Sequence, residues 1–373
     1  MRKIRLVEVR SELAAGTRGA SMGIDALKIA SIKRHSNFFM RFEPVSVKDE
    51  NQLLFGNPQF QFAKYGEGVY TMLNRVCDTI TDLRKQELFP IVLAGDHSTA
   101  AGTICGIKQA NPDKRLGVIW IDAHADFHTP YTTPSGNMHG MPLAMVSALD
   151  NEACEINDVE EETETIWEKI KQIGGRGPKI SPSDVVFIGV RDTEAAEDHI
   201  IEQHGIRNFK TEELNQKGVE KVAAEALDVL KDCDQVYISF DVDSLDTSIS
   251  TGTGTPVANG LSKEEAFELN RILIKDKRVC CWEIVEVNPT LDTENRMAEN
   301  AFDILEATTD SLVENFWLME QQIKEGISAA LQALYNHDLP SEDISLQPTR
   351  KEFEGTYTFV TFPFARFSKK SPE

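Results

Sequence analysis

Short apolar runs alternate along the chain with amphipathic stretches of helical period. The apolar runs cover residues 4–9, 90–96, 115–126, 184–192, 236–243 and 282–287. Continuous apolar runs of this length are typical of parallel strands that are buried on both faces of a sheet. Helical periodicity is found over residues 71–87, 218–233 and 262–277, and the last stretch opens with Ser262 and Glu265 at the spacing of a capping box. The alternation predicts an α/β fold built from strand–helix–strand units.

Two segments depart from this alternation. Residues 150–164 hold eight acidic side chains and no Lys or Arg, and we expect a solvated surface insertion there. A long helical stretch over about 295–337 is followed by a polar tail and then by residues 355–367, whose β-branched and aromatic side chains predict a strand docked on this subunit or another. We expect one domain over residues 1–340 and a C-terminal extension over 341–373; a two-domain chain is the alternative.

Composition and charge narrow the choice of partners. The 373-residue chain is 41% hydrophobic and 27% charged, as in ordinary globular proteins. Its formal net charge of -21 would repel nucleic acids and anionic membrane surfaces, so we expect neither as a partner. The N-terminal stretch MRKIRLVEVR has no apolar core of signal-peptide length, and no stretch approaches the roughly 18 apolar residues of a membrane span. These features predict a cytoplasmic protein.

The cysteines fit the same compartment. The chain has six, and no two of them form a CxxC pair. Scattered cysteines in a large chain are more typical of reduced, packed thiols than of a disulfide framework. We therefore expect no structural disulfide.

Three of the predicted strands end in carboxylate and imidazole side chains. The stretches are GDHS (95–98), DAHADFH (122–128) and SFDVDSLD (239–246), which place Asp96, His97, Asp122, His124, Asp126, His128, Asp241, Asp243 and Asp246 at or just after buried strands. In an open parallel sheet the carboxyl ends of the strands face one crevice, which is the usual ligand site of this architecture. We therefore expect these side chains to meet in space.

Crowded carboxylates at such a place favour a metal site. Carboxylates held together away from water repel one another unless a cation compensates their charge. Alternate residues of an extended strand point to the same side, so DxHxD at 122–126 and DxD at 241–243 each form a small chelating unit. Oxygen ligands with two histidines and no thiolate favour Mn²⁺ or a similar divalent ion, and carboxylates can bridge two ions about 3.5 to 4 Å apart. A binuclear site is the hypothesis; a mononuclear site, or a Mg²⁺ site for phosphoryl transfer, is the alternative.

With these motifs the chain resembles the ureohydrolase superfamily, and within it most closely the arginase branch. The resemblance is carried by GDHS (95–98), DAHADFHTPYTTPSGNMHGMP (122–142), SFDVDSLD (239–246), GTGTPVANGL (252–261) and EVNP (286–289), and it extends over about residues 18–337. It implies a three-layer αβα sandwich around a mainly parallel sheet. It also implies two Mn²⁺ ions, or another divalent metal, with His97 and Asp126 on one ion, His124 and Asp243 on the other, and Asp122 and Asp241 bridging.

The resemblance further implies metal-assisted hydrolysis of a guanidinium group. Bound metal can lower the pKa of water to about 7 and so provide a nucleophile near neutral pH. Asp126, His139 and Glu286 match the family's catalytic positions. Glu286 would hold the planar guanidinium through paired N–H bonds, and His139 would pass a proton to the leaving amine. From L-arginine the products would be urea and L-ornithine.

The loop between Asp126 and His139 favours an amino acid as the substrate. Ser135 and Asn137 match the positions at which arginases hold the α-carboxylate, and hydroxyl and amide donors suit that group. Agmatine has no carboxylate for this loop to hold. The resemblance therefore favours an arginase over an agmatinase.

Two pocket positions depart from the arginase pattern. His128 stands where arginases commonly have Asn, and Glu194 stands where they have the Asp that contacts the α-amino group. A third position, Thr255 in the GTGTP stretch, matches a substrate contact. Because Glu is one methylene longer than Asp and imidazole offers different donors from an amide, we expect an altered affinity or substrate length.

Three functional classes agree with the sequence. An L-arginine hydrolase comes first, and a ureohydrolase of another substrate, such as formimidoylglutamate, a guanidino acid or guanidine, comes second. A binding or regulatory protein that has lost catalysis is the third, but six ligands together with His139 and Glu286 argue against it. By similarity to arginases we expect a homotrimer or homohexamer.

Overall fold

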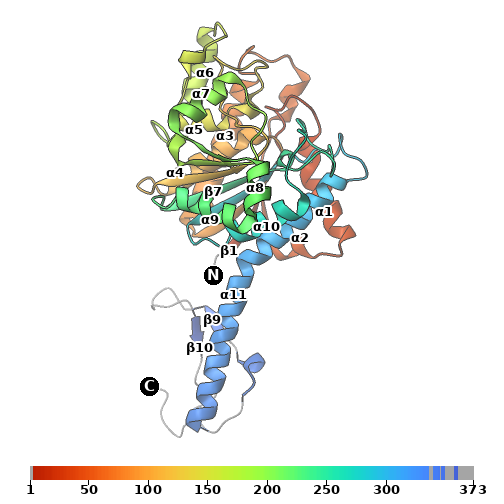
Figure 1. Cartoon of the computed structure of the whole chain (residues 1–373), viewed down its shortest axis with the longest axis vertical. Helices are drawn as coiled ribbons and strands as arrows, with labels where there is room; N and C mark the ends of the chain where they lie inside the picture. The colour runs from red at the N-terminus through yellow and green to blue at the C-terminus, as the bar shows by residue number, and fades with distance from the viewer. Residues whose placement is uncertain (1–2, 336–338, 345, 349–356, 360–373) are drawn as a thin grey trace. The chain divides into compact units, whose positions relative to one another are not determined.

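The computed structural model describes residues 3–335, 339–344, 346–348 and 357–359 of the chain (Figure 1). Tertiary contacts divide the chain into two compact units, Arg2–Thr308 and a second that begins at Thr309. Within the described residues, none of the helices combines the length and the apolar character that crossing a bilayer requires. All six cysteines lie in the described part, and no disulfide joins them, as the sequence predicts.

An eight-stranded sheet forms the centre of the first unit. Its strands are β1 (Lys3–Val9), β2 (Pro44–Val47), β3 (Leu88–Ala94), β4 (Leu116–Ile121), β5 (Val185–Ile188), β6 (Arg207–Phe209), β7 (Gln235–Asp241) and β8 (Val279–Val285). Their order across the sheet is β2-β1-β3-β8-β7-β4-β5-β6, and every neighbouring pair is parallel. The six predicted strands are confirmed. The sequence pattern missed β2 and β6, which are short edge strands without an apolar run.

Helices alternate with the strands along the chain. They are α1 (Gly23–Lys33), α2 (Phe38–Arg41), α3 (Gly66–Lys85), α4 (Ala100–Ala110), α5 (Pro142–Ser147), α6 (Glu161–Lys171), α7 (Ala195–His204), α8 (Thr211–Lys217), α9 (Val219–Val229), α10 (Lys263–Leu273) and α11 (Arg296–Tyr335). Helices α3 to α6 lie on one side of the sheet, and α9 and α10 lie on the other (Figure 1). This arrangement confirms the predicted αβα sandwich.

Burial of the central strands follows from this layering. All six side chains of β4 are buried, and Val118 and Trp120 pack in one cluster with Val76 of α3 and Ile104 of α4. Alternate residues of a strand face opposite sides of the sheet, so the intervening Ile119 belongs to the other face. A continuous apolar run is what two covered faces require.

The predicted capping box at the start of α10 is confirmed. The backbone N–H of Glu265 donates to Oγ of Ser262 at 3.2 Å, and Oε2 of Glu265 accepts from the backbone N–H of Ser262 at 2.8 Å. These two bonds satisfy N–H groups that have no partner inside the helix.

The second unit contains the later part of α11 and a two-stranded sheet. Strand β9 (Leu346–Pro348) pairs antiparallel with β10 (Tyr357–Phe359). Strand β10 falls within the predicted strand region 355–367, whose other residues lie outside the described part of the chain. Of the helix predicted over about 295–337, the structure describes Arg296–Tyr335 as α11.

Candidate metal centre and substrate pocket

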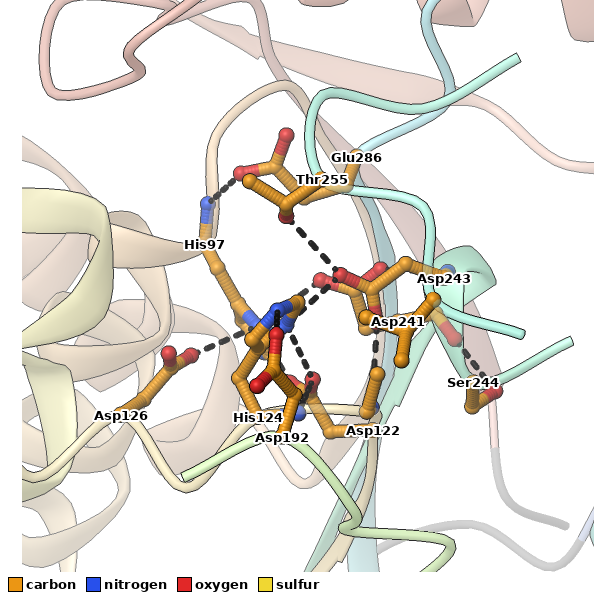
Figure 2. Close-up of polar contacts among 12 residues, drawn as sticks. His97, Asp122, His124, Asp126, Asp192, Asp241, Asp243, Ser244, Thr255 and Glu286 are labelled. Carbon is orange, nitrogen blue, oxygen red and sulfur yellow. Dashed lines mark hydrogen bonds and ion pairs between the residues drawn. The ribbon is translucent and has the colours of Figure 1, made fainter. Parts of the chain in front are cut away.

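Four neighbouring strands bring the predicted residues together. In the order β3-β8-β7-β4, the carboxyl ends of these strands lie side by side. They carry His97 after β3, Glu286 after β8, Asp241 and Asp243 at the end of β7, and Asp122, His124 and Asp126 after β4. Figure 2 shows these side chains converging from their separate strands. The sheet order therefore explains why motifs almost 190 residues apart, at His97 and Glu286, meet in one site.

His97 lies at the centre of three carboxylates. Its Nδ1 is 3.0 Å from Oδ2 of Asp122, 3.1 Å from Oδ2 of Asp241 and 3.2 Å from Oδ2 of Asp126. On the far side of the ring, Nε2 lies 2.7 Å from Oγ of Ser239, and the ring stacks on Trp120 with centroids 4.1 Å apart. The ring is therefore fixed in orientation, with Nδ1 facing the carboxylates.

A second histidine completes an adjoining group. Nδ1 of His124 is 3.0 Å from Oδ2 of Asp243 and 3.5 Å from Oδ1 of Asp122. The opposite oxygen of Asp243 accepts from the backbone N–H of Ala123 at 3.1 Å, and Thr255 donates from Oγ1 to Oδ2 of Asp243 at 3.2 Å. These bonds hold the Asp243 carboxylate toward His124.

Burial and mutual repulsion disturb the ionisation of the cluster. Burial, with the charges of Asp243 and Asp122, raises the pKa of Asp241 well above its usual range. Burial and the charge of Asp122 raise the pKa of Asp243 to about 6. Burial alone would lower the pKa of His97, but its close contacts with the carboxylates of Asp122, Asp126 and Asp241 outweigh burial, so the His97 pKa is raised. A raised pKa favours the protonated form of these side chains. Their protons offset the negative charge that a bound cation would neutralise.

The donor atoms fit a metal ion. Ligand atoms of His97, Asp122 and Asp241 lie within 4.8 Å of one another, and so do those of Asp122, His124 and Asp243. Nδ1 of His97 and Oδ2 of Asp122 are buried and lie 3.0 Å apart, but neither makes a hydrogen bond of normal geometry with a described residue, although buried polar atoms are normally paired. Two groups that share one carboxylate are a candidate metal-binding site with oxygen and imidazole ligands.

Above this cluster, Glu286 and His139 face each other. Oε1 of Glu286 accepts from the backbone N–H of His97 at 2.9 Å and lies 3.4 Å from Nδ1 of His139. Glu286 has φ +65, a left-handed conformation that is unfavourable for a Glu and persists only where its surroundings fix it. Burial would lower the pKa of His139, but its hydrogen bond with Glu286 and the nearby carboxylates raise it.

The pocket over the metal cluster has a volume of about 170 Å³. It is lined by every residue predicted for the site except the buried Asp122: His97, His124, Asp126, His128, Ser135, Asn137, His139, Glu194, Asp241, Asp243, Thr255 and Glu286. The side chains predicted for the site thus lie together around one pocket. Asp96 and Asp246 follow two of the same strands, β3 and β7, but bind loop atoms instead: Asp96 accepts from the backbone N–H of Ser98, and Asp246 accepts from the backbone N–H of Ser248.

One wall of the pocket is the loop that carries Ser135 and Asn137. Gly136 between them has φ +74, and a Cβ there would lie 1.9 Å from the carbonyl oxygen of Gln61, so only glycine fits. Lys64, two residues before α3 begins, reaches this loop: its Nζ donates to Oδ1 of Asn137 at 3.2 Å. An ammonium group can only donate, so the amide must turn its oxygen to Lys64 and keep its N–H groups as donors.

The opposite wall is the start of α7. Nε2 of His128 is 3.7 Å from Oε2 of Glu194 and 3.6 Å from Oε2 of Glu197. Burial lowers the pKa of His128, which favours the neutral imidazole. Glu197 accepts from the backbone N–H groups of Phe127 at 3.1 Å and Glu194 at 3.2 Å, and its burial with the charge of Asp126 raises its pKa to about 8.

Several residues of this site were not predicted from the sequence. Thr133, Asp192, Thr193 and Glu197 also line the pocket, and Lys64 contacts Asn137 from outside the lining. The Glu194–Glu197 spacing, which resembles a helix start, was a signal that could have found Glu197. The contact of Lys64 joins segments 73 residues apart, and no local pattern indicates it.

Comparison with known proteins places these observations in a family. A model of the arginase family matches residues 2–309. An arginase from Brevibacillus brevis is 34% identical over 311 residues, which cover 82% of this chain and 96% of that protein. The crystal structure of an arginase from Bacillus subtilis has a TM-score of 0.67 at 32% identity, covering 82% of this chain and 98% of that one. A formimidoylglutamase structure from Bacillus subtilis shares only the fold, with a TM-score of 0.65 at 20% identity over 84% and 87% of the two chains.

The match extends through all four strand ends that build the site. It includes the two groups of candidate metal ligands. This chain therefore belongs to the arginase family and is a metal-dependent amidine hydrolase.

Proposed function

We propose that this protein hydrolyses L-arginine to urea and L-ornithine at a pair of Mn²⁺ ions. One observation carries the proposal: a metal-ligand cluster, the Glu286–His139 pair and the Ser135–Asn137 loop all line a single pocket. A guanidinium group at the cluster and a carboxylate at the loop are the two ends of one substrate. The similarity to arginases from Brevibacillus brevis and Bacillus subtilis, at 34% and 32% identity, supports this choice.

We assign the ligands as the family pattern implies. His97 and Asp126 would hold one ion, His124 and Asp243 the other, and Asp122 and Asp241 would bridge. The sharing of Asp122 between two groups of donor atoms supports a bridging role for that residue, and Asp126 lies within 3.2 Å of Nδ1 of His97. When bound, two such cations lower the pKa of water and compensate negative charge in the transition state. Other divalent ions with a preference for oxygen and imidazole fit the same ligands.

Glu286 would bind the guanidinium. Its carboxylate is buried, and its Oε1 is held by the backbone N–H of His97, so it faces the pocket in one orientation. A fixed carboxylate and a planar guanidinium match in a two-bond geometry. The left-handed backbone at Glu286 is then a cost of aiming this side chain at the substrate.

His139 would supply the proton to the leaving amine. Its raised pKa favours the imidazolium, which is the form that can donate, and its contact with Glu286 places it beside the guanidinium site. Asp126 completes the proposed catalytic set. Its Oδ2 lies 3.2 Å from Nδ1 of His97, at the end of the pocket where the guanidinium would react.

The far end of the substrate would lie between the two walls. Ser135 and Asn137 would donate to the α-carboxylate, while Glu194 on the opposite wall would accept from the α-amino group. His128 lies beside Glu194, and Thr255 faces the metal end through its bond to Asp243. We therefore propose that Ser135 and Asn137 hold the carboxylate end of L-arginine and that Glu194 holds its amino group.

A ureohydrolase of another substrate is the second candidate. The observation in its favour is the contact between His128 and Glu194, because both departures from the arginase pattern lie at the end of the pocket that would select the substrate. Formimidoylglutamate, a guanidino acid and guanidine each present an amidine-type carbon to the cluster but differ at the far end.

Turnover of a substrate panel separates these candidates. The Mn²⁺-loaded protein is assayed with L-arginine, agmatine, 4-guanidinobutyrate, guanidine and formimidoylglutamate, with urea, ammonia and formamide measured as products. We expect the highest kcat/KM with L-arginine and a value at least about tenfold lower with agmatine, which lacks the carboxylate. Equal turnover of the two compounds, or turnover of neither, contradicts the assignment.

Three further properties are inferred from the sequence and its family. They are a cytoplasmic location, assembly as a homotrimer or homohexamer, and a division of the chain into a catalytic domain over residues 1–340 and an extension over 341–373. Size-exclusion chromatography with light scattering tests the assembly directly.

A further inference from the structure

The acidic segment, residues 150–164, makes contacts that its charge does not explain. Its acidic side chains are largely exposed, as predicted for a solvated insertion. The first part of the segment, residues 150–157, also bonds to both walls of the substrate pocket through its backbone and two asparagines. We call this part the strap.

The strap binds the wall that carries Ser135 and Asn137. The backbone N–H groups of Ile156 and Asn157 donate to the carbonyl oxygen of Tyr131 at 2.9 and 3.1 Å. The side-chain amide of Asn157 donates to the carbonyl oxygens of Pro130 at 2.9 Å and Thr133 at 2.7 Å. One asparagine side chain therefore ties together two points of the loop.

Through Thr133, these bonds restrain the position of Ser135. Oγ1 of Thr133 accepts from the backbone N–H groups of Ser135 at 3.3 Å and Gly136 at 3.0 Å. Because Asn157 fixes the carbonyl group of Thr133, it also restrains the turn that presents Ser135 to the pocket. Asn157 thus acts on the substrate through other residues and not by contact.

The other end of the strap binds the opposite wall. The side-chain amide of Asn151 donates to the carbonyl oxygen of Ala196 at 2.8 Å, in the first turn of α7 between Glu194 and Glu197. Asn151 has φ +55, a left-handed conformation that Asn tolerates better than most residues. The strap therefore joins the two walls by hydrogen bonds to main-chain atoms.

Asp150 anchors the strap to the core. Its Oδ1 accepts from Nε1 of Trp167 at 2.7 Å and from Nζ of Lys171 at 2.6 Å, and both of these α6 residues are buried. Its carbonyl oxygen accepts from Oγ1 of Thr129 at 2.8 Å. An anchored segment that contacts both walls can hold them at a fixed separation.

We propose that the strap sets the spacing between the carboxylate wall and the α7 wall, with Asn151 and Asn157 as positioning residues for substrate specificity. The inference rests on the proposed function, because it assumes that the two walls hold the two ends of the amino-acid group. It assigns the strap a role in selecting substrates whose carboxylate and amino groups can reach the two walls at the same time.

The test combines kinetics with variants that separate hydrogen bonding from packing. Asn157→Asp keeps the side-chain volume but replaces the two N–H donors with an acceptor that faces two carbonyl groups. Asn157→Ala removes the donors and the volume. Asn151→Gly keeps the left-handed backbone and removes the bond to Ala196. Glu155→Gln is the matched control, since it removes one exposed charge from the strap and none of these bonds.

With Mn²⁺-loaded enzyme we expect Asn157→Asp and Asn157→Ala to raise KM for L-arginine by about tenfold with kcat changed by less than about threefold. For the two Asn157 variants, kcat/KM for agmatine, which lacks the carboxylate, should stay within about twofold of the wild-type value. Asn151→Gly should also raise KM for L-arginine. Glu155→Gln should behave as wild type. Equal losses with both substrates, or an unchanged preference in Asn157→Asp, would overturn the proposal.

Amide hydrogen exchange tests the strap separately from the substrate assignment. In Asn157→Asp, residues 129–137 should exchange faster than in wild type, and in Asn151→Gly residues 193–197 should do so, while the sheet stays protected. If wild type fails to hydrolyse L-arginine, the proposed function falls, whereas unchanged exchange at both walls would reject the strap itself. If the variants exchange faster but keep the wild-type preference for L-arginine over agmatine, the strap restrains the walls but has no role in specificity, and the proposal is rejected.

Discussion

Nε2 of His128 lies 3.7 Å from Oε2 of Glu194, so the two residues that depart from the arginase pattern contact each other at the far end of the pocket. Glu reaches one methylene further than Asp, and imidazole presents a ring nitrogen where an amide is usual. The contact indicates that the two replacements form one altered subsite. Glu197, 3.6 Å from the same nitrogen, belongs to it as well.

A double-mutant cycle tests whether His128 and Glu194 act together. We expect His128→Asn and Glu194→Asp each to lower kcat/KM for L-arginine, because each single variant leaves one residue fitted to a missing partner. The double variant should recover part of the loss, with a coupling free energy of about 0.5–1 kcal/mol. Additive effects in the cycle would show that the two positions are independent.

Lys64 should favour substrates that carry a carboxylate. Lys64→Met frees the Asn137 amide to turn and removes a positive charge near the proposed carboxylate site, so kcat/KM for L-arginine should fall roughly tenfold, mainly through KM. Agmatine should be unaffected. Lys108→Met is a matched control, since Lys108 donates to the backbone carbonyl of Lys114 and does not line the substrate pocket. Loss of activity toward both substrates alike would argue against this role.

His139→Asn separates proton transfer from metal binding. If His139 delivers the proton to the leaving amine, kcat should fall by about 10²–10⁴ with little change in KM and with the wild-type metal content. Steady-state kinetics with elemental analysis of the same sample checks both parts. A variant that has lost its metal would make His139 a ligand, and an unchanged kcat would remove it from the reaction.

Glu197 should make the metal-depleted protein less stable as the pH rises. Burial raises its pKa from 4.5 to about 8, so between these values the folded protein keeps a proton that the unfolded chain has lost. Unfolding then releases a proton, and the free energy of unfolding falls as the pH rises, by at most about 1.4 kcal/mol per pH unit from this group. Below pH 4.5 both states are protonated, and the contribution is fully present.

Urea unfolding of the metal-depleted protein at pH 5.5 and 8 measures this slope. Glu197→Gln should reduce the difference between the two pH values, and Glu202→Gln, at an exposed position of the same helix, should leave it unchanged. Equal slopes in wild type and Glu197→Gln would mean that Glu197 does not titrate in this range.

Most of the fold follows from local patterns, whereas part of the site does not. Buried runs such as 115–126 predict strands because both faces of the sheet are covered, and Ser262 with Glu265 marks the start of α10 through bonds within one turn. Strands β2 and β6 lie at the edges, where few apolar side chains are needed. Each pairs with the strand that precedes it in the chain, but its own residues do not form the apolar run that marks a buried strand.

The candidate metal ligands were predictable because all six lie in three short motifs, GDHS (95–98), DAHADFH (122–128) and SFDVDSLD (239–246), each at the end of an apolar run. The sheet order then needs only to bring the strand ends together. Lys64 and Asn157 were missed for the opposite reason: each acts through a contact across dozens of residues, 73 in the case of Lys64 and Asn137. In the acidic segment, the charges indicated a solvated surface, but the bonds to the pocket walls use Asn side chains and main-chain atoms.

Metal stoichiometry tests the central claim, a binuclear centre whose ligands come from the ends of three strands, β3, β4 and β7. Metal-depleted protein is titrated with Mn²⁺, and bound metal and urea release from L-arginine are measured on the same samples. We expect about two Mn²⁺ ions per wild-type chain at full activity. Asp122→Asn and Asp241→Asn should each lose both ions, because a bridging ligand serves two ions. Asp246→Asn, which alters a loop bond after the same strand, should keep both ions. Full urea release with one ion or none per wild-type chain would contradict the claim.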